Sequence, residues 1–389
     1  MLRATILGGA FLLLRILSAI RPARAVEQTR TYTRPSADML TRSGSTATDP
    51  EYNPDSVLTI LRAGGMPCTL ASVDVGASAE VYHLNAQDAA AYGRRRKAAA
   101  FLSAKARVPC SVQASAQADL AVCIPRTQRR TVFLGDCYTD SGTLTTVALG
   151  QTPDGKAAVA DLATMPHLLI AGATGSGKSV CLNSILASLL LRNDPGGLQL
   201  VLVDPKQVEL SIYSGLPHLA RPISTAPGDA LDALEWACDE MNRRYAALRH
   251  QGVRSINDTR GRFPRLFLVI DELADLMLTS RSLKKEVESC IVRIAQLGRA
   301  AGVHLIVATQ RPTTNVLTGL IKANIPARIA FAVASDTDSR VILDSGGAET
   351  LAGRGDGLFL CPDACGHVER FRAAYTPDED IRRIVQSWT

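Results

Sequence analysis

The sequence predicts an α/β protein whose main domain has a largely parallel sheet, preceded by a small α+β domain and a short apolar N-terminal segment. Three observations predict this class. After Thr131, strand-like apolar runs alternate with helical patterns, which requires parallel strands joined by crossover helices. Between Val57 and Arg130, short strand-like runs surround an alanine-rich helical stretch. The residues from Ala4 to Leu14 are uncharged and mostly apolar.

The composition is that of a folded protein. A chain of 389 residues is long enough for two folded units, and 46% hydrophobic with 21% charged residues excludes wholesale disorder. The net charge of +6 is compatible with an anionic partner, but it also fits enzymes that bind no nucleic acid. The nine cysteines are scattered, without the dense spacing of a disulfide scaffold, so we expect a reducing compartment.

Shifts in composition predict the domain boundaries. The stretch from Val26 to about Asp55 is rich in Thr, Arg, Ser, Asp and Pro and has almost no aliphatic periodicity, which is typical of a linker. We therefore expect an apolar segment at 1–25, a flexible linker at 26–55, a small α+β domain at 56–132 and the main domain at 133–389.

The small domain is expected to contain two early strands and one helix. Its strand-like runs are Cys68–Val75 and Ala79–His83, and the helical stretch is Gln87–Lys105. The basic cluster Arg94–Lys97 lies in this helix. We interpret it as a solvated helix face, with phosphate contact as the alternative, and assign it no site.

The main domain should alternate strands and helices. The expected strands are His167–Ala171, Leu198–Val203, Leu266–Ile270, Val303–Ala308, Arg328–Val333 and Gly357–Leu360. The expected helices are Ser179–Arg192, Asp229–His250, Leu283–Ala301 and Asp336–Asp344. A last helix should start after Thr376 as its N-cap, with proline in its first turn, and run toward Trp388.

One glycine-rich segment carries the clearest chemistry. It matches G-x-x-x-x-G-K-S/T and lies between an apolar strand and a helical pattern, as a phosphate-binding loop (P-loop) must. Backbone amides at the helix start would cradle the phosphates of ATP, the lysine would reach the terminal phosphates, and the last hydroxyl would ligate Mg²⁺. The segment consists of Gly172, Ala173, Thr174, Gly175, Ser176, Gly177, Lys178 and Ser179.

Two acids follow another buried strand. Asp271 and Glu272 come directly after Leu266–Ile270, at the carboxyl end where a neighbour of the P-loop strand would bring them to the phosphates. We expect Asp271 to hold Mg²⁺ and Glu272 to act on the attacking water. The alternative is that they only cap the following helix, and the two roles are not exclusive.

Two more polar residues end strands at the same edge. Gln310 follows Val303–Ala308 and could sense the terminal phosphate, with a loop amide bonded to backbone as the alternative. Lys206 follows Leu198–Val203, and contact with nucleotide or polymer competes with a plain surface position. The pair Cys361 and Cys365, with His367 beyond, lacks the further ligands of a zinc site, so we interpret it as a loop.

Several motifs in one order resemble the FtsK/SpoIIIE family of DNA translocases, over about Leu134 to Trp388. The resemblance implies a RecA-like ATPase motor that assembles as a homo-oligomeric ring, usually a hexamer, around double-stranded DNA, with ATP between subunits. The segment from Val57 to Arg130 resembles the family's smaller domain more weakly. The matching segments are Met165–Ser179, Asp204–Lys206, Glu209–Ser211, Gly298–Gly302, Ala308–Pro312 and Gly319–Pro326.

The resemblance also implies residue roles. Lys178 with Ser179, and Asp271 with Glu272, match the nucleotide-binding loop and the hydrolysis pair. Arg299 matches the arginine offered to a neighbouring subunit's ATP, and a plain position at a helix end is the alternative. Lys322 and Asn324 match a stretch that lies toward the DNA channel in the family. Asp336 stands where relatives often carry a basic residue, which places a second trans-acting cation in doubt.

The N-terminal segment leaves two interpretations open. Arg15 interrupts the apolar run, which resumes at Ile16–Ile20 and falls short of the roughly 20 residues of a comfortable span. One interpretation is a membrane anchor at residues 4–20. The following arginines would then keep the motor cytoplasmic, at the inner face of the membrane. A cleaved signal peptide is less favoured, because export would separate an ATP-dependent domain from its fuel.

These observations favour an ATP hydrolase that translocates double-stranded DNA in segregation or transfer. One alternative is a related ring ATPase that moves protein in a secretion system, which keeps the ATP site and changes the cargo. The other is a non-hydrolysing, nucleotide-dependent scaffold, against which the acid pair Asp271 and Glu272 argues.

Overall fold

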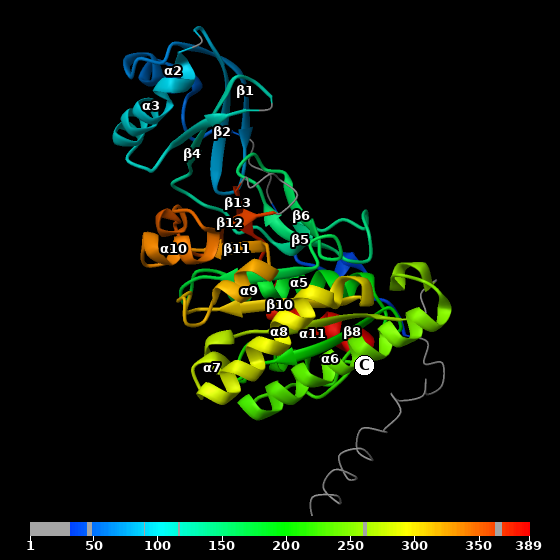
Figure 1. The fold of residues 1–389 in the computed structure, drawn as a ribbon. Helices are drawn as coiled ribbons and strands as arrows, with labels where there is room; N and C mark the ends of the chain where they lie inside the picture. Colours follow the sequence, from blue (N-terminus) through cyan, green and yellow to red (C-terminus); the bar gives the residue numbers. More distant parts are fainter. Residues whose placement is uncertain (1–31, 45–48, 89, 116, 260–262, 362–367) are drawn as a thin grey trace, which may run out of the picture. The chain divides into compact units, whose positions relative to one another are not determined.

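The computed structural model describes residues 32–44, 49–88, 90–115, 117–259, 263–361 and 368–389 (Figure 1). The apolar segment expected at 1–25, and Cys365 and His367 of the cysteine-rich loop, lie outside these ranges, so the interpretations given for them stay predictions. Within the described ranges, no helix is long and apolar enough to cross a membrane.

The α/β class with a largely parallel sheet is confirmed. Among the described residues, the main sheet has nine strands in the order β6-β5-β13-β12-β11-β7-β10-β9-β8. The five strands from β11 to β8 are parallel, and the other four continue the sheet with antiparallel pairing. The parallel strands are β7 (His167–Ala171), β8 (Leu198–Val203), β9 (Arg265–Ile270), β10 (Val303–Thr309) and β11 (Ala327–Phe331). The antiparallel strands are β5 (Thr146–Gln151), β6 (Ala157–Asp161), β12 (Asp356–Leu360) and β13 (Val368–Ala373).

Helices cover both faces of this sheet because its central strands are apolar on both sides (Figure 1). In β7, Leu168 and Ile170 belong to one core, and Leu169 and Ala171 belong to the other. Helices α5 (Lys178–Arg192) and α11 (Asp378–Trp388) contribute to the first core. The helices of the second core include α6 (Pro227–Gln251), α7 (Leu273–Met277), α8 (Arg281–Ala301), α9 (Gly319–Asn324) and α10 (Asp336–Leu343).

Local chemistry sets the ends of these helices. Helix α8 begins after Ser280, whose hydroxyl accepts from the Leu283 amide, and it ends at Gly302 with φ 63°. For α11 the expected N-cap is wrong. The cap position is Pro377, and the Thr376 hydroxyl instead lies 2.9 Å from the Ser184 hydroxyl of α5. A tertiary contact therefore replaces the local one.

The residues expected as a small α+β domain form, within the described ranges, an antiparallel sheet of order β1-β2-β4-β3 with two helices. Its strands are β1 (Cys68–Val75), β2 (Ala79–Ala86), β3 (Ser111–Ala114) and β4 (Leu120–Pro125). Its helices are α2 (Pro54–Ala63) and α3 (Ala91–Ala106), and both contribute buried side chains to one core with these strands. Helix α2 was not expected, because its first residues fall in the polar stretch assigned to the linker.

Part of the stretch expected as a linker packs on the main domain. Leu40 is buried in the core, the Thr41 amide donates to Asp380 at 2.7 Å, and Arg34 donates to the Leu191 carbonyl at 2.7 Å. A single leucine among polar residues has no periodicity, so the sequence pattern did not reveal this docking.

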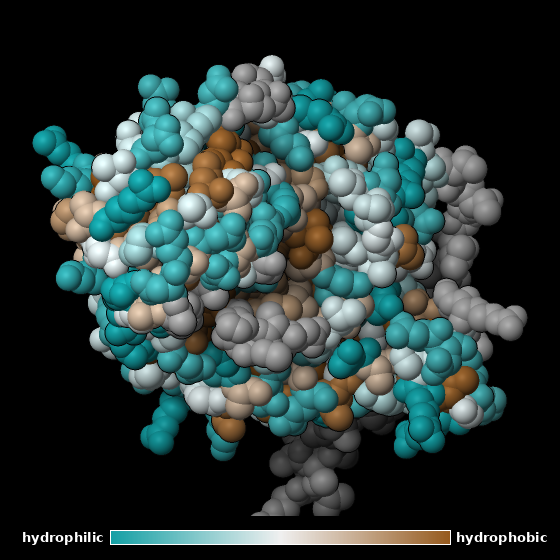
Figure 2. Space-filling model, turned by 90° about the horizontal axis from the view of Figure 1, so that it is seen from above, coloured by the Kyte–Doolittle hydropathy of each residue, from teal (hydrophilic) through white to brown (hydrophobic). Residues whose placement is uncertain are grey.

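The surface is that of a folded domain, and burial affects the thiols. Figure 2 shows a face covered mainly by hydrophilic residues, with hydrophobic ones scattered in small groups. The cysteines of the described ranges are free thiols. Burial raises the pKa of the Cys181 thiol to about 12, so that thiol is not a reactive one.

Candidate nucleotide-binding site

The P-loop connects the end of β7 to the start of α5, at the carboxyl edge of the parallel sheet. Its backbone is tied to both neighbouring strands. The Gly172 amide donates to the Thr309 carbonyl of β10 at 3.3 Å, and the Ala173 amide donates to the Ala332 carbonyl after β11 at 2.9 Å. The loop is therefore held at the centre of the sheet, where Gly177 directly precedes α5.

Glycine is required at two positions of the loop for different reasons. Gly177 has φ 122°, a backbone conformation that side chains disfavour, and a Cβ there would lie 2.6 Å from the backbone of Gly355. At Gly172 a Cβ would lie 2.6 Å from the Ser176 hydroxyl and 2.7 Å from the Phe331 Cβ. These glycines let the loop approach its neighbours closely and leave its amides available for an anion.

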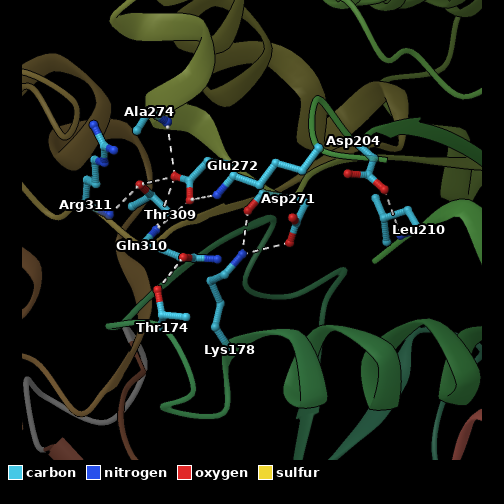
Figure 3. Close-up of polar contacts among 11 residues, drawn as sticks. Thr174, Lys178, Asp204, Leu210, Asp271, Glu272, Ala274, Thr309, Gln310 and Arg311 are labelled. Carbon is cyan, nitrogen blue, oxygen red and sulfur yellow. Dashed lines mark hydrogen bonds and ion pairs between the residues drawn. The ribbon is translucent and has the colours of Figure 1, made fainter. Parts of the chain in front are cut away.

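Lys178 and Asp271 form a buried ion pair (Figure 3). The ammonium donates to the Asp271 carboxylate at 2.7 Å and to the Asp271 backbone carbonyl at 2.6 Å. The side chains are 3% and 1% exposed, so water solvates neither charge and each depends on the other for stabilisation. The expected proximity of the two groups is therefore present, and a triphosphate would compete with Asp271 for the lysine.

Asp271 retains capacity for a cation. Its second oxygen, Oδ2, is buried and has no hydrogen-bond partner among the described residues. The Ser179 hydroxyl belongs to the cavity wall at the start of α5. Within the described ranges no three acidic, histidine or cysteine side chains converge as a metal site. This sparse donor set fits Mg²⁺, which protein usually holds by one or two side chains, with phosphate and water completing the shell.

Glu272 is enclosed by hydrogen-bond donors (Figure 3). The Thr309 hydroxyl donates to it at 2.7 Å, and the Gln310 amide lies 3.1 Å from both carboxylate oxygens. The Ala274 amide donates at 3.3 Å, which makes Glu272 the N-cap of α7. Glu272 therefore has the capping role considered as the alternative. To take a proton from water it must exchange one of these donors for that water.

Two further contacts connect the ends of neighbouring strands. The Thr174 hydroxyl of the P-loop donates to the Gln310 side chain at 2.8 Å, so Gln310 bonds the loop that would hold the phosphates. The Lys206 ammonium lies 3.3 Å from Glu272, with 40% of its side chain exposed. Thr309 was not assigned a role from the sequence. Its position at the end of an apolar strand, one residue before Gln310, is the signal that could have suggested one.

A cavity of about 1040 Å³ opens over the P-loop. Its wall includes Thr174, Lys178, Ser179 and Gln310, so much of the expected nucleotide site shares one space. The cavity is also lined by four arginines that the sequence did not single out. One of them, Arg126, lies 3.7 Å from the Glu80 carboxylate, and the other three have no such ion pair among the described residues. These three are Arg129, Arg354 and Arg372, and we refer to them as the arginine triad.

Arg299 lies apart from this cavity. It is exposed in the last turn of α8 and lines a second cavity of about 600 Å³, together with Asp161 and Arg265. Burial alone would raise the pKa of Asp161, but hydrogen bonds from Thr145 and Thr143 lower it below its ordinary value. Because Arg299 lines this second cavity and is not among the residues that line the P-loop cavity, it does not reach the P-loop cavity of its own chain.

Lys322 and Asn324, expected to contact DNA, lie on the short helix α9. The Lys322 ammonium donates to Asp344 at 2.8 Å, and the same carboxylate also accepts from Arg328. The Asn324 amide donates to the Leu320 carbonyl at 2.8 Å. Any contact of Lys322 with phosphate would have to compete with Asp344.

Comparison with known proteins identifies the family. The model of the FtsK/SpoIIIE family matches residues 132–268 and 258–314, which contain the P-loop, the acid pair and Gln310. The chain belongs to the FtsK/SpoIIIE family. It is 49% identical over 282 residues to the DNA translocase FtsK of Tropheryma whipplei, a match that covers 68% of this chain and 37% of that protein. The chain spans less than half the length of the curated relatives it matches.

Solved structures share the P-loop ATPase fold. The pCW3 conjugation coupling protein TcpA, in its monomer form with ATPγS, has a TM-score of 0.58 at 24% identity, covering 85% of this chain and 99% of that one. The cytoplasmic domain of the type VII secretion ATPase EccC of Thermomonospora curvata has a TM-score of 0.53 at 29% identity, covering 62% of this chain and 31% of that one.

Proposed function

We propose that this chain is an ATP-hydrolysing motor that translocates double-stranded DNA. The observation that carries the proposal is the juxtaposition of Lys178, Asp271 and Glu272 at one edge of the sheet, in a member of a family whose curated relatives are DNA translocases. ATP would lie in the cavity above the P-loop, with its phosphates against the loop amides and the Lys178 ammonium.

Hydrolysis would use the acid pair as two separate groups. Mg²⁺, when bound, neutralises phosphate charge, and its protein ligands would be the Ser179 hydroxyl and the free oxygen of Asp271. Lys178 moves from Asp271 to the β- and γ-phosphates. Glu272 orients the water and accepts its proton as the water oxygen attacks the γ-phosphorus, and the bond to the β-phosphate breaks to leave ADP and phosphate.

The contacts of Gln310 would also link the binding of a γ-phosphate to the position of the Glu272 carboxylate. Gln310 donates its backbone amide to Glu272, and its side chain accepts from Thr174 of the P-loop. A γ-phosphate that displaces the Thr174 contact would therefore shift the residue that holds the catalytic carboxylate. This connection supports the role of phosphate sensor that the sequence predicts for Gln310.

The decisive experiment measures steady-state phosphate release by the full chain with and without duplex DNA. We expect DNA to stimulate hydrolysis, and we expect the stimulation to weaken steeply with salt, because contacts to the phosphate backbone release counterions. Lys178→Ala should lower the rate roughly 10²–10³-fold, as loss of a charged group at the phosphates does. Lys285→Ala, which removes an exposed lysine of α8, is the matched control and should leave the rate unchanged.

The outcomes separate the cargo from the chemistry. Normal hydrolysis by Lys178→Ala would contradict the ATP site itself. Hydrolysis that depends on Lys178 but ignores DNA would contradict DNA translocation. It would favour a protein-moving ATPase, the cargo class suggested by the likeness to a type VII secretion ATPase. Nucleotide binding without turnover would favour the scaffold alternative.

We also propose a ring, probed through Arg299. Arg299 is exposed and remote from its own P-loop cavity, which suits an arginine that completes a neighbour's site. Arg299→Ala should lower hydrolysis about 10³-fold or more, because an arginine supplied to a phosphoryl transition state has that value. Mixing Arg299→Ala with Lys178→Ala chains should restore part of the activity, since some interfaces then carry an intact pair. Failure to recover activity in any mixture would oppose action between subunits.

The proposal extends to cellular location and process. We propose a cytoplasmic motor domain that acts in DNA segregation or transfer, because ATP and DNA are both present in the cytoplasm. Attachment to the inner face of the membrane through residues 4–20 is tested by fractionating cells that express the full chain or a version that begins at residue 26.

A further inference from the structure

We infer that the arginine triad, Arg129, Arg354 and Arg372, binds the α-phosphate of the nucleotide. The inference rests on the proposed function in one respect, that the cavity above the P-loop holds ATP. It extends that function by assigning a role to three of the four arginines that line this cavity.

The order of the strands gives the direction in which the nucleotide lies. The P-loop follows β7, and the acid pair and Gln310 follow β9 and β10 on one side of it. Strands β12 and β13, beyond β11, lie on the other side. A nucleotide whose γ-phosphate points to the acid pair must extend its α-phosphate away from β9 and β10. Arg354 lies two residues before the start of β12, and Arg372 lies in β13.

The backbone directly after Arg354 is fixed against the P-loop, and Arg354 itself is exposed. The amide of the next residue, Gly355, donates to the Ser176 carbonyl at 2.7 Å, and its backbone lies so close to Gly177 that no Cβ fits between them. Arg354 itself has φ 51°, an uncommon conformation for a residue with a side chain. The cavity lining includes Arg354 together with Lys178 and Ser179, the residues at the start of α5.

Arg372 is a half-buried cation whose neighbouring acid is paired with another arginine. Its Nη1 is buried and has no hydrogen-bond partner among the described residues. The acid opposite it in the sheet is Asp356, but that carboxylate accepts from Arg370 at 2.9 and 2.6 Å. An unsatisfied buried donor of this kind is costly, and a phosphate oxygen would satisfy it.

The charge of the cavity lining points to the same ligand. Burial lowers the pKa of Arg372, Asp356 opposes this effect, and the positive charges of Arg129 and Arg354 add to it. Of the described residues that line the cavity, Glu209 is the one acid, and it follows β8 at the far end of the sheet. Lys178 is already neutralised by Asp271, and Arg126 is paired with Glu80. The uncompensated positive charge of the cavity therefore lies on the triad, and a phosphate group is the anion that the nucleotide offers there.

The test is isothermal titration of the full chain with ADP, ATPγS and 2′-deoxy-ADP. Arg372→Gln should weaken all three about tenfold or more, because each ligand carries the α-phosphate and a charged hydrogen bond has roughly that value. Arg354→Gln and Arg129→Gln should weaken them in the same pattern. Arg372→Lys keeps the charge and should recover part of the affinity. Arg382→Gln, which removes an exposed arginine of α11, is the matched control and should bind like the unaltered chain.

Each remaining outcome counts against the inference. Unchanged affinities in Arg372→Gln and Arg354→Gln would remove the triad from the site. A loss confined to ATPγS would place the triad at the γ-phosphate, and a loss that spares 2′-deoxy-ADP would place it at the ribose. If the unaltered chain binds none of the three nucleotides, the proposed function fails, which is a result distinct from failure of the triad alone. Circular dichroism of each variant shows whether it is folded.

Discussion

The two sides of the P-loop satisfy their charges in opposite ways. On the side of β9 and β10, Lys178 is paired with Asp271, and Glu272 is surrounded by four donor groups from Thr309, Gln310, Ala274 and Lys206. On the side of β12 and β13, Arg372 has a buried nitrogen that no described residue pairs with, and the nearby Asp356 accepts from Arg370.

This difference indicates two kinds of preorganisation. The acid side holds its groups in place without a ligand, so binding must first exchange existing bonds, such as that between Lys178 and Asp271. The arginine side has unsatisfied donors, so an anion can bind there with little rearrangement. We therefore expect the acid side to control the rate of hydrolysis and the arginine side to control affinity.

The largest expected effect is on the turnover number, from a substitution that changes the acid side alone. Glu272→Gln keeps a carbonyl that can accept from Thr309 and Gln310, but it loses the base that takes the proton from water. The turnover number should fall roughly 10²–10⁴-fold while the affinity for ATPγS stays unchanged. Phosphate release under saturating ATP and calorimetric titration measure the two quantities.

Glu286→Gln, an exposed change on α8, is the control for this comparison and should affect neither quantity. If Glu272→Gln weakened nucleotide binding and left turnover intact, the assignment of rate to the acid side would be wrong.

The second prediction concerns the ion pair between Asp356 and Arg370, which lies next to Arg372. Asp356→Asn removes the charge that pairs with Arg370, and the free energy of unfolding should fall by roughly 1.5–3 kcal/mol, the range for a hydrogen bond to a charged group. Denaturation by urea measures it. Arg370→Gln should cost a similar amount, because both changes break the same pair. An unaltered midpoint in both variants would show that this pair does not hold β12 and β13 in register.

The smallest expected effect tests the core away from both sides of the P-loop. His218 is buried against the Trp388 ring, and burial lowers its pKa to about 4, although a hydrogen bond with the Asn193 carbonyl opposes this shift. Its pKa in the unfolded chain is about 6.5. Between these values the unfolded state binds more protons, so stability should fall as the pH falls from 7 toward 4.

At pH 5.5 this histidine alone should cost roughly 1 kcal/mol relative to pH 7. Urea denaturation of the unaltered chain and of His218→Gln across this range measures the contribution. The variant should lose less stability on acidification. Equal pH slopes for the two chains would contradict the assignment to His218.

Much of the fold could be predicted because it depends on local patterns. The six strands expected in the main domain are present within two residues of their predicted ends. Apolar runs of this length, bounded by polar residues, are typical of buried strands. Strands β5, β6 and β13 were not expected. β13 mixes Arg and Glu with Phe, and β5 and β6 lack a run of large aliphatic residues and lie toward the antiparallel edge of the sheet.

The sequence by itself determined the phosphate loop and the acid pair, because each is a contiguous run whose chemistry needs only a strand before it. Only the tertiary structure decided what surrounds them. Arg129, Arg354 and Arg372 lie far apart in the chain and line one cavity only after β12 and β13 join the sheet beyond β11. The pairing of Lys322 with Asp344 and the separation of Arg299 from its own P-loop have the same origin. The order of strands, which local residue patterns do not encode, sets which side chains face one another.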